Sequence, residues 1–323
     1  MPFPTDEEIM KTGAALVAQL QELFGKHPGF RPAHAKGILL KGAFTPTEKA
    51  ASLSVAPHFN SPSTPLTIRF SNSTGIPNIP DTDPNADPRG IAIRFNLPVN
   101  PTTGHRQHTD IIAHSTPFFP TRTGEKFLEF LQAVAASPPG TPSPSPVEKV
   151  VGANPSILAF VSAPKPAPSS FAREQFWSVT AFKLIDTSGK ETYIRYHVVP
   201  ELGVDTLSTD ELATKDTDYL FTDIKERVKT SGGAGGVKFK LLAQLAGEGD
   251  VTDDATVHWP DDREVVELGT IKIESLVEDS DKEQKYDIFD PIPRVKGVEP
   301  SADPLLEMRA AVYLISGKQR RAA

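Results

Sequence analysis

The sequence predicts an α+β fold in which one large antiparallel sheet closes into a barrel flanked by helices. Three observations lead to this class. Several segments alternate apolar and polar residues with the period of two that is typical of strands. Helical patterns open and close the chain and interrupt the strands mainly near residues 126–160. The regular strand–helix–strand alternation of a parallel sheet is missing, which argues against a Rossmann-type fold.

The two ends of the chain carry the clearest helical signals. Near the N-terminus, Thr5 and Glu8 have the spacing of a capping box, and we expect Gly25 to end the helix that they begin. The apolar residues of this helix recur at helical spacing: Ile9, Leu16, Leu20 and Leu23. The last helix is expected to begin at Asp303, a capping residue before a first-turn proline, and to stop at Gly317.

Strands are predicted between these helices where residues alternate or β-branched residues gather: 66–70, 91–97, 181–184, 193–199, 237–245 and 265–273. A further helix is predicted at 126–136. Two proline-rich stretches, 138–146 and 164–168, indicate stiff extended connectors, and the segment between them indicates one or two short helices. Because these prolines bound a helical insert, we expect a single domain over residues 1–323.

The composition is that of an ordinary globular protein, and it excludes several kinds of site. The 323 residues include 34 Lys and Arg against 41 Asp and Glu, which gives a net charge of −7, and no cysteine. Without cysteine there is no disulfide, no thiolate site for zinc or an iron–sulfur cluster, no cysteine nucleophile and no thiolate-bound haem. The negative balance gives no electrostatic footprint for nucleic acid.

The sequence also lacks the signals of a membrane or secreted protein. No apolar run reaches the ~18–20 residues of a membrane span, and the acidic stretch MPFPTDEEIM differs from a signal peptide. We therefore expect a cytoplasmic protein without membrane contact. The stretch GGAGG at residues 232–236 is predicted to be a loop before a strand, because its spacing does not fit a phosphate-binding turn.

Two segments in the N-terminal part carry candidates for function, each with an ordinary structural alternative. His34 lies among small residues in the stretch RPAHAKG, and it either serves a site or is a core histidine with satisfied hydrogen bonds. Arg69 and Ser71 share one face of a predicted strand. If that face is interior, the arginine needs an anion from a side chain or a ligand. On an edge strand it would be solvated instead.

Two clusters of potential metal ligands are weaker candidates. Residues 81–87, DTDPNAD, resemble the start of a calcium loop but lack its glycine and its closing glutamate, so we interpret them as a turn. His105, His108 and His114 lie close together around Asp110, yet their spacings match no standard metal site. A metal cluster is therefore the less favoured interpretation of these histidines.

The last predicted helix carries a pair with a specific chemistry. Arg309 and Tyr313 are four residues apart and therefore project from one helical face. A guanidinium beside a phenol stabilises the phenolate, and a phenolate is one of the few side-chain anions that bind ferric haem. The alternative is an arginine–tyrosine pair that only packs the helix.

Several motifs, taken in order, resemble those of the haem catalases. They are RPAHAKG at 31–37, RFS at 69–71, DPRG at 87–90, DIIAHSTPF at 110–118, FDP at 289–291 and RAAVY at 309–313. The resemblance covers nearly the whole chain and points to the small catalase-related peroxidases, in which a minimal catalase core stands alone. It implies a catalase-like antiparallel β-barrel of about eight strands, with flanking helices and a haem pocket.

The resemblance also implies roles for individual residues. Tyr313 matches the ligand of the iron of haem b, and Arg309 matches the residue that keeps this ligand anionic. His34 matches the distal histidine, and Ser71 matches the hydroxyl that orients it. The other matches are three arginines for the haem propionates and one of two phenylalanines for the distal side: Arg31, Arg69 and Arg320; Phe118 or Phe119. His114 is a departure, because catalases carry an asparagine there.

The function that this resemblance implies is that of a haem-dependent peroxidase. It would reduce organic hydroperoxides or hydrogen peroxide through a ferryl intermediate, with a small organic electron donor, and weak catalase activity is compatible with it. One alternative is a haem enzyme that rearranges fatty-acid hydroperoxides, similar to the allene oxide synthases, and another is a non-enzymatic haem-binding protein. Only ten residues follow Tyr313, so we expect no NADPH site, and we expect a monomer or a small homo-oligomer.

Overall fold

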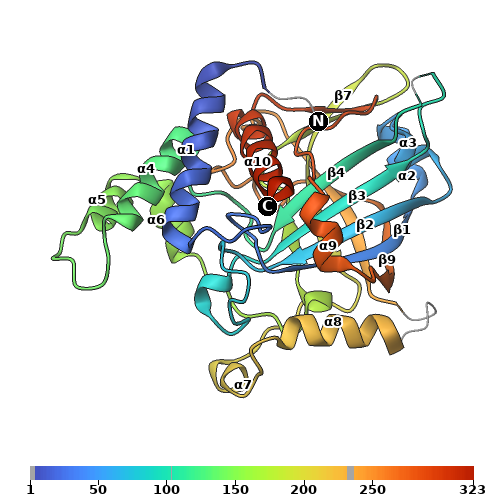
Figure 1. The fold of residues 1–323 in the computed structure, drawn as a ribbon. Helices are drawn as coiled ribbons and strands as arrows, with labels where there is room; N and C mark the ends of the chain where they lie inside the picture. Colours follow the sequence, from blue (N-terminus) through green and yellow to red (C-terminus); the bar gives the residue numbers. More distant parts are fainter. Residues whose placement is uncertain (1–3, 103, 231–235) are drawn as a thin grey trace.

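Antiparallel strands form a closed barrel at the centre of the structure (Figure 1). The computed structural model describes residues 4–102, 104–230 and 236–323. Its strands are β1 (Gly37–Pro46), β2 (Thr64–Ser71), β3 (Gly90–Leu97), β4 (Gln107–His114), β5 (Phe176–Trp177), β6 (Phe182–Ile185), β7 (Glu191–Pro200), β8 (Lys238–Leu245), β9 (Val265–Leu276) and β10 (Val298–Pro300). Their order is β10-β6-β7-β5-β4-β3-β2-β1-β9-β8, and pairing of β7 with β8 closes an eight-stranded ring. The predicted α+β barrel is confirmed.

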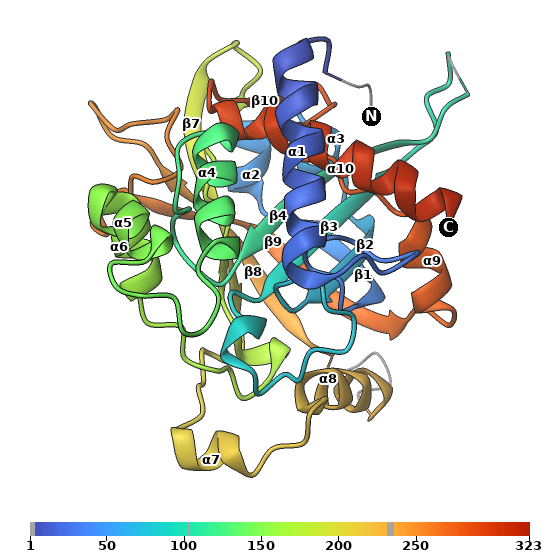
Figure 2. The same ribbon diagram turned by 60° about the vertical axis from the view of Figure 1, so that its left-hand side comes forward.

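Helices flank this barrel in the part of the chain that the structure describes. They are α1 (Glu7–Phe24), α2 (Glu48–Leu53), α3 (Pro57–Asn60), α4 (Gly124–Ala135), α5 (Pro146–Ala153), α6 (Pro155–Ser162), α7 (Thr209–Ala213), α8 (Tyr219–Thr230), α9 (Ser280–Tyr286) and α10 (Pro304–Ala322). Figure 2 shows α1 crossing α10 with α4 alongside. The proline-bounded insert forms two helices, α5 and α6, as the sequence allowed.

The two-residue period of the strands separates the barrel core from an outer face. Ile38, Phe70, Ile91 and Ala113 lie opposite one another on β1 to β4 and belong to the main hydrophobic core. The row one residue further along therefore lies on the outer face of the barrel wall: Gly37, Ser71, Gly90 and His114. The functional candidates Ser71 and His114 thus share one row, with a glycine between them.

Both terminal helices differ from the sequence prediction in one detail. The N-cap of α1 is Asp6, not Thr5, because the Asp6 carboxylate accepts from the backbone N–H groups of Glu8 and Ile9 at 2.9 and 3.0 Å. Helix α10 does not stop at Gly317 but continues to Ala322. A Cβ at position 317 would overlap Ile288, so this glycine permits close packing and does not end the helix.

Residues 81–87 form a turn, as predicted, with a single 3₁₀ turn at Pro84–Ala86. Asp81 is fully buried at its start. The carboxylate of Asp81 accepts from Lys36 Nζ at 2.7 Å, from Asn72 Nδ2 at 2.7 Å and from the backbone N–H of Leu220 at 2.9 Å. The turn therefore ties the residue before β1 and the residue after β2 to α8.

Three further predictions from the sequence concern a metal cluster, the loop at residues 232–236 and helices that could cross a membrane. Among the described residues, no group of three or more His, Cys, Asp or Glu side chains could hold a metal ion. The glycine stretch 232–236 lies outside the described residues except for Gly236. Within the described ranges, no helix has the length and apolar character needed to cross a membrane.

One histidine is buried against aromatic residues of the main core. His58, in α3, packs against Phe59 and Phe95 with ring centroids 4.1 and 4.5 Å away, and its Nδ1 makes no hydrogen bond with any residue that the structure describes. Burial lowers the pKa of His58 from 6.5 to about 3. The folded protein therefore holds this imidazole neutral at pH values where the unfolded chain protonates it.

Substitution His58→Leu should make the free energy of unfolding less sensitive to acid. Below pH 6.5 the unfolded chain binds a proton that folded His58 binds only near pH 3, so stability falls as the pH falls through this window. Between pH 7.5 and 5 the contribution is about 2 kcal/mol, measurable by urea unfolding at both pH values. Phe171→Leu is the control, since this buried ring packs against Phe70 and Phe221 and its loss should lower stability without changing this difference. If the free energy of unfolding of His58→Leu differs between pH 7.5 and 5 by as much as that of the wild type, His58 is not the source of the acid sensitivity.

Candidate functional site

The site is built on the outer face of the barrel, where β2 ends and β3 begins. His34 comes from the loop before β1 and has a left-handed backbone, with φ of 55°. Its Nδ1 lies 3.1 Å from Ser71 Oγ. A Cβ at Gly90 would lie 2.7 Å from Ser71 Oγ and 3.0 Å from His34 Nδ1. The glycine therefore makes room for the imidazole against the barrel wall.

His114 lies directly opposite Gly90 in the pairing of β3 with β4. Its Nδ1 is 2.7 Å from Thr116 Oγ1, while its Nε2 is buried and has no hydrogen-bond partner in the described structure. Desolvation and the nearby His34 and Arg309 lower the pKa of His114 to about 3. Desolvation and the nearby Arg69 lower the pKa of His34 to about 4. Both imidazoles are therefore neutral at neutral pH.

The structure distinguishes the two candidate phenylalanines. The ring of Phe119 lies 6.4 Å from that of His114, measured between centroids, and 5.0 Å from Phe127. The Phe118 ring instead lies near Phe160 and His258, at 6.3 and 6.4 Å. Phe119 is thus the one that adjoins the imidazole pair.

Helix α10 contributes the guanidinium and the phenol. Arg309 Nε donates to Tyr313 Oη at 3.3 Å, one helical turn away. The Arg309 charge is among the causes that lower the pKa of both His34 and His114. Arg309, near the C-terminal end of the chain, is therefore close enough to His34, near its N-terminal end, for their charges to interact.

Three arginines form a cationic cluster beside these residues. Arg69 donates to Gln284 Oε1 and to the carbonyl groups of His34 and Ala35, at 2.9 to 3.2 Å. Arg31 and Arg320 both donate to the carbonyl of Asp287, each at 2.9 Å. Among the described residues, none of these three guanidiniums lies within 4.0 Å of a carboxylate oxygen.

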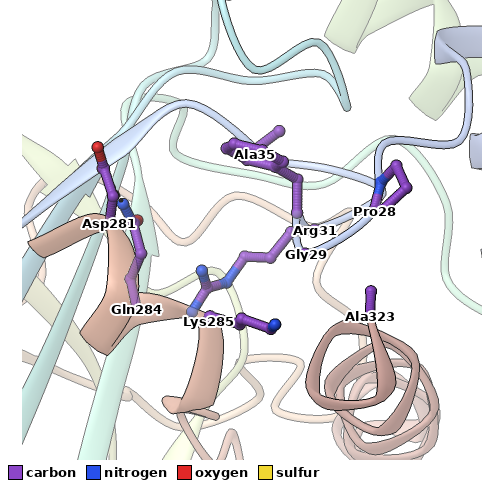
Figure 3. Close-up of a pocket in the computed structure, with 9 residues that line it drawn as sticks. Pro28, Gly29, Arg31, Ala35, Asp281, Gln284, Lys285 and Ala323 are labelled. Atoms are coloured by element: carbon purple, nitrogen blue, oxygen red, sulfur yellow. Dashed lines mark hydrogen bonds between the residues drawn. The ribbon is translucent and has the colours of Figure 1, made fainter.

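Burial of the cluster has an electrostatic cost. Desolvation, with repulsion from neighbouring arginines, lowers the pKa of Arg69 and of Arg320 to about 9. The pKa of Arg31 is lowered for the same reasons. Figure 3 shows the Arg31 side chain extending toward α9, beside Gln284 and Lys285, at a pocket of about 240 Å³. The cluster would be stabilised by an anion with more than one carboxylate.

The position of Arg69 also settles an alternative that the sequence left open. Strand β2 is paired on both sides, with β1 and β3, and Arg69 is only 3% exposed. The alternative that Arg69 is a solvated arginine on an edge strand is therefore wrong. A Cβ at Gly37 would overlap the Arg69 guanidinium, so this glycine admits the arginine as Gly90 admits His34.

Sequence reasoning missed the supporting residues of the site. Gly37 and Gly90 belong to motifs quoted above, but their role depends on strand register. Gln284 and Asp287 come from α9 and the segment that follows it, which no sequence pattern linked to the arginines. Thr116 was detectable in principle, since a hydroxyl two residues after a candidate histidine can reach its ring.

Comparison with known proteins gives relatives of the same size. The catalase-related peroxidase of Mycolicibacterium paratuberculosis is 34% identical over 301 residues, which cover 92% of this chain and 90% of the relative. The catalase-related peroxidase of Synechococcus elongatus is 30% identical over 309 residues, which cover 94% of this chain and 87% of the relative.

The fold is similar to that of larger catalases. The structure of catalase A from Saccharomyces cerevisiae superposes with a TM-score of 0.78 at 21% identity. The match covers 94% of this chain and 64% of the yeast chain, so this chain spans less than two thirds of the larger protein. The family model for catalase matches residues 16–323. Together with the relatives at 30% identity or more, this match shows that the chain belongs to the catalase family.

Proposed function

We propose that the chain is a haem-dependent peroxidase that reduces organic hydroperoxides or hydrogen peroxide with electrons from a small organic donor. The observation that carries the proposal is the convergence of three groups on one face of the barrel. They are a guanidinium–phenol pair, two neutral imidazoles and a cluster of arginines without carboxylate partners. The names of the two relatives of similar size support a reaction with peroxide.

The residues present fit a haem. A haem carries two propionate carboxylates, which suit the guanidiniums of Arg31, Arg69 and Arg320, because the residues that the structure describes offer these guanidiniums carbonyl and amide oxygens but no carboxylate within 4.0 Å. A phenol that accepts from a guanidinium, as Tyr313 does, suits ferric iron as a ligand. The partnerless Nε2 of His114 is an unfilled polar position of the kind that a bound group or substrate satisfies.

A bound haem would supply an iron centre for cleavage of the peroxide O–O bond. The residues of the chain have their own parts in this reaction. Arg309 donates to Tyr313 Oη and so fixes the direction in which this oxygen faces. His34, neutral because it is buried, can accept the proton of the peroxide hydroxyl and return it to the oxygen that leaves as water or alcohol. Ser71 orients this imidazole through Nδ1.

The other expectations from the sequence belong to the same proposal. They are a reaction with peroxide and an organic donor rather than with nucleic acid or a membrane, a cytoplasmic location, and a monomer or small homo-oligomer. We favour peroxidase over catalase activity because His114 stands where catalases have asparagine, which changes the shape and polarity around the substrate.

Tyr313→Phe should abolish normal haem ligation. The variant keeps the ring but loses the oxygen that accepts from Arg309, so the tyrosinate-type ferric spectrum should disappear and peroxidase activity should fall by about 100-fold or more. The ultraviolet–visible spectrum of protein expressed with haem measures this directly. Tyr286→Phe, at an exposed tyrosine, is the matched control and should keep the wild-type spectrum. A wild-type spectrum in Tyr313→Phe would disprove the ligand assignment.

His34→Gln should leave haem binding intact and lower turnover of peroxide. Loss of a general base typically costs ~10²–10⁴ in rate, so stopped-flow mixing with peroxide should show a decrease in this range. In the wild type the neutral form is the active one, and the pKa of His34 is about 4. The rate should therefore be level from pH 8 to 5 and fall below about pH 4. A rate that titrates near pH 6.5 would contradict this assignment.

Gly90→Ala should displace His34 without removing any functional group. The added Cβ would lie 3.0 Å from His34 Nδ1 and 2.7 Å from Ser71 Oγ, so the imidazole must move. We expect haem binding to persist and the rate of peroxide reaction to fall by about tenfold or more. Gly152→Ala, where a Cβ meets nothing within 4 Å, is the control. Equal rates in the two variants would show that Gly90 does not seat the imidazole.

A further inference from the structure

The hydrogen bond between His114 and Thr116 bears on which ring nitrogen carries the proton. A neutral imidazole has one N–H donor and one acceptor nitrogen. His114 uses Nδ1 toward Thr116 Oγ1, at 2.7 Å, and leaves Nε2 buried without a partner. If the proton is on Nδ1, His114 therefore offers the site a lone pair at Nε2, and if the proton is on Nε2, it offers an N–H group.

The geometry around Thr116 favours the hydroxyl as the donor in this bond. Its distance of 2.7 Å to Nδ1 lies well within the range of bonds that a hydroxyl donates, about 2.5–3.0 Å, and at the short end of the range for bonds from N–H groups, about 2.7–3.2 Å. The other acceptor near the hydroxyl is the carbonyl of Phe118, at 3.5 Å, which is too long for a good hydrogen bond. Thr116 is 1% exposed, so bulk water does not compete for its proton.

We propose that Thr116 is a positioning residue that holds His114 as the Nε2–H tautomer, so that His114 offers a hydrogen-bond donor to the peroxide. This inference rests on the proposed function and names the substrate class that the donor suits. An alkyl hydroperoxide carries one hydrogen, which His34 takes, and its alkyl-bearing oxygen can only accept. A lone pair on His114 Nε2 would face this oxygen unpaired, whereas an N–H group can donate to it.

His114 in the Nε2–H form and an amide at the same position would offer the same kind of donor. The asparagine found in catalases has an NH₂ group that donates whatever its neighbours are. An imidazole donates from Nε2 only when its tautomer is held, and the hydroxyl of Thr116 supplies this constraint. We therefore expect alkyl hydroperoxides to be accepted through His114 Nε2–H, as well as hydrogen peroxide.

The tautomer is measurable without any catalytic assay. Long-range ¹H–¹⁵N NMR of histidine-labelled full-length protein, loaded with zinc protoporphyrin to avoid paramagnetism, separates the two tautomers by their nitrogen shifts. Wild type and Thr116→Ser should show protonated Nε2 at His114. Thr116→Val, which replaces the hydroxyl by a methyl group of similar size, should show a mixture or the opposite tautomer. Protonated Nδ1 in the wild type would overturn the proposal.

Fluoride gives a second readout, because it binds ferric haem and only accepts hydrogen bonds. In the holoenzyme, Thr116→Val should weaken fluoride binding between about twofold and tenfold, the range expected for one neutral hydrogen bond. Thr116→Ser should match the wild type. Combining His114→Asn with Thr116→Val should restore the affinity, since the amide donates without help from Thr116.

The outcomes separate this inference from the proposed function. Unchanged fluoride affinity in Thr116→Val, or no recovery with His114→Asn, would overturn the role of Thr116. Protein that binds no haem would contradict the proposed function instead. In that case the same NMR measurement on the full chain as purified still tests the tautomer, because both partners of the hydrogen bond belong to this chain.

Discussion

The absence of a side chain at two positions of the barrel wall makes the rest of the site possible. Gly90 lies between Ser71 and His114 in the strand pairing, and its missing Cβ leaves the space that the His34 ring occupies. Gly37, in the same row on β1, leaves space for the Arg69 guanidinium. The alternate row of these strands fills the barrel core, so a shift of register would move apolar side chains out of it. The register that builds the core therefore also seats the imidazole and the guanidinium.

Charge is distributed at the site in a way that favours an anionic ligand. The cluster of Arg31, Arg69 and Arg320 is held by carbonyl oxygens, an amide and a hydroxyl, which accept hydrogen bonds but do not neutralise the charge. The lowered pKa of each guanidinium expresses this imbalance. A ligand with two carboxylates would relieve it, and binding to the folded state alone would raise the free energy of unfolding by an amount that grows with the logarithm of the ligand's affinity.

The fold was largely predictable because strand and helix periods are local properties. The six strands predicted from alternation correspond to β2, β3 and β6 to β9, and the predicted helices correspond to α1, α4 and α10 with the α5–α6 insert. Strand β4 was not predicted, because its histidines and Asp110 interrupt the alternation of apolar and polar residues. Asp110 is a carboxylate at a buried position because it pairs with Arg94 of the neighbouring strand, a contact that the sequence does not show. Gly317 shows the converse error. In a sequence, a glycine that ends a helix cannot be told from a glycine that permits close packing. The structure shows that Gly317 is of the second kind, because α10 continues past it and a Cβ there would overlap Ile288.

By itself, the sequence determined the two-residue periods that make a barrel, the one-turn spacing of Arg309 and Tyr313, and the motifs that identify a catalase-like chain. Tertiary structure decided which residues of those motifs meet. It selected Phe119 over Phe118 beside His114, placed three distant arginines in one cluster and set Thr116 against His114 Nδ1. The physical reason is that the period of a strand or helix depends on residues that are close together in the sequence. Burial, lowered pKa values and hydrogen-bond partners arise only when the strands pair and the terminal helices pack.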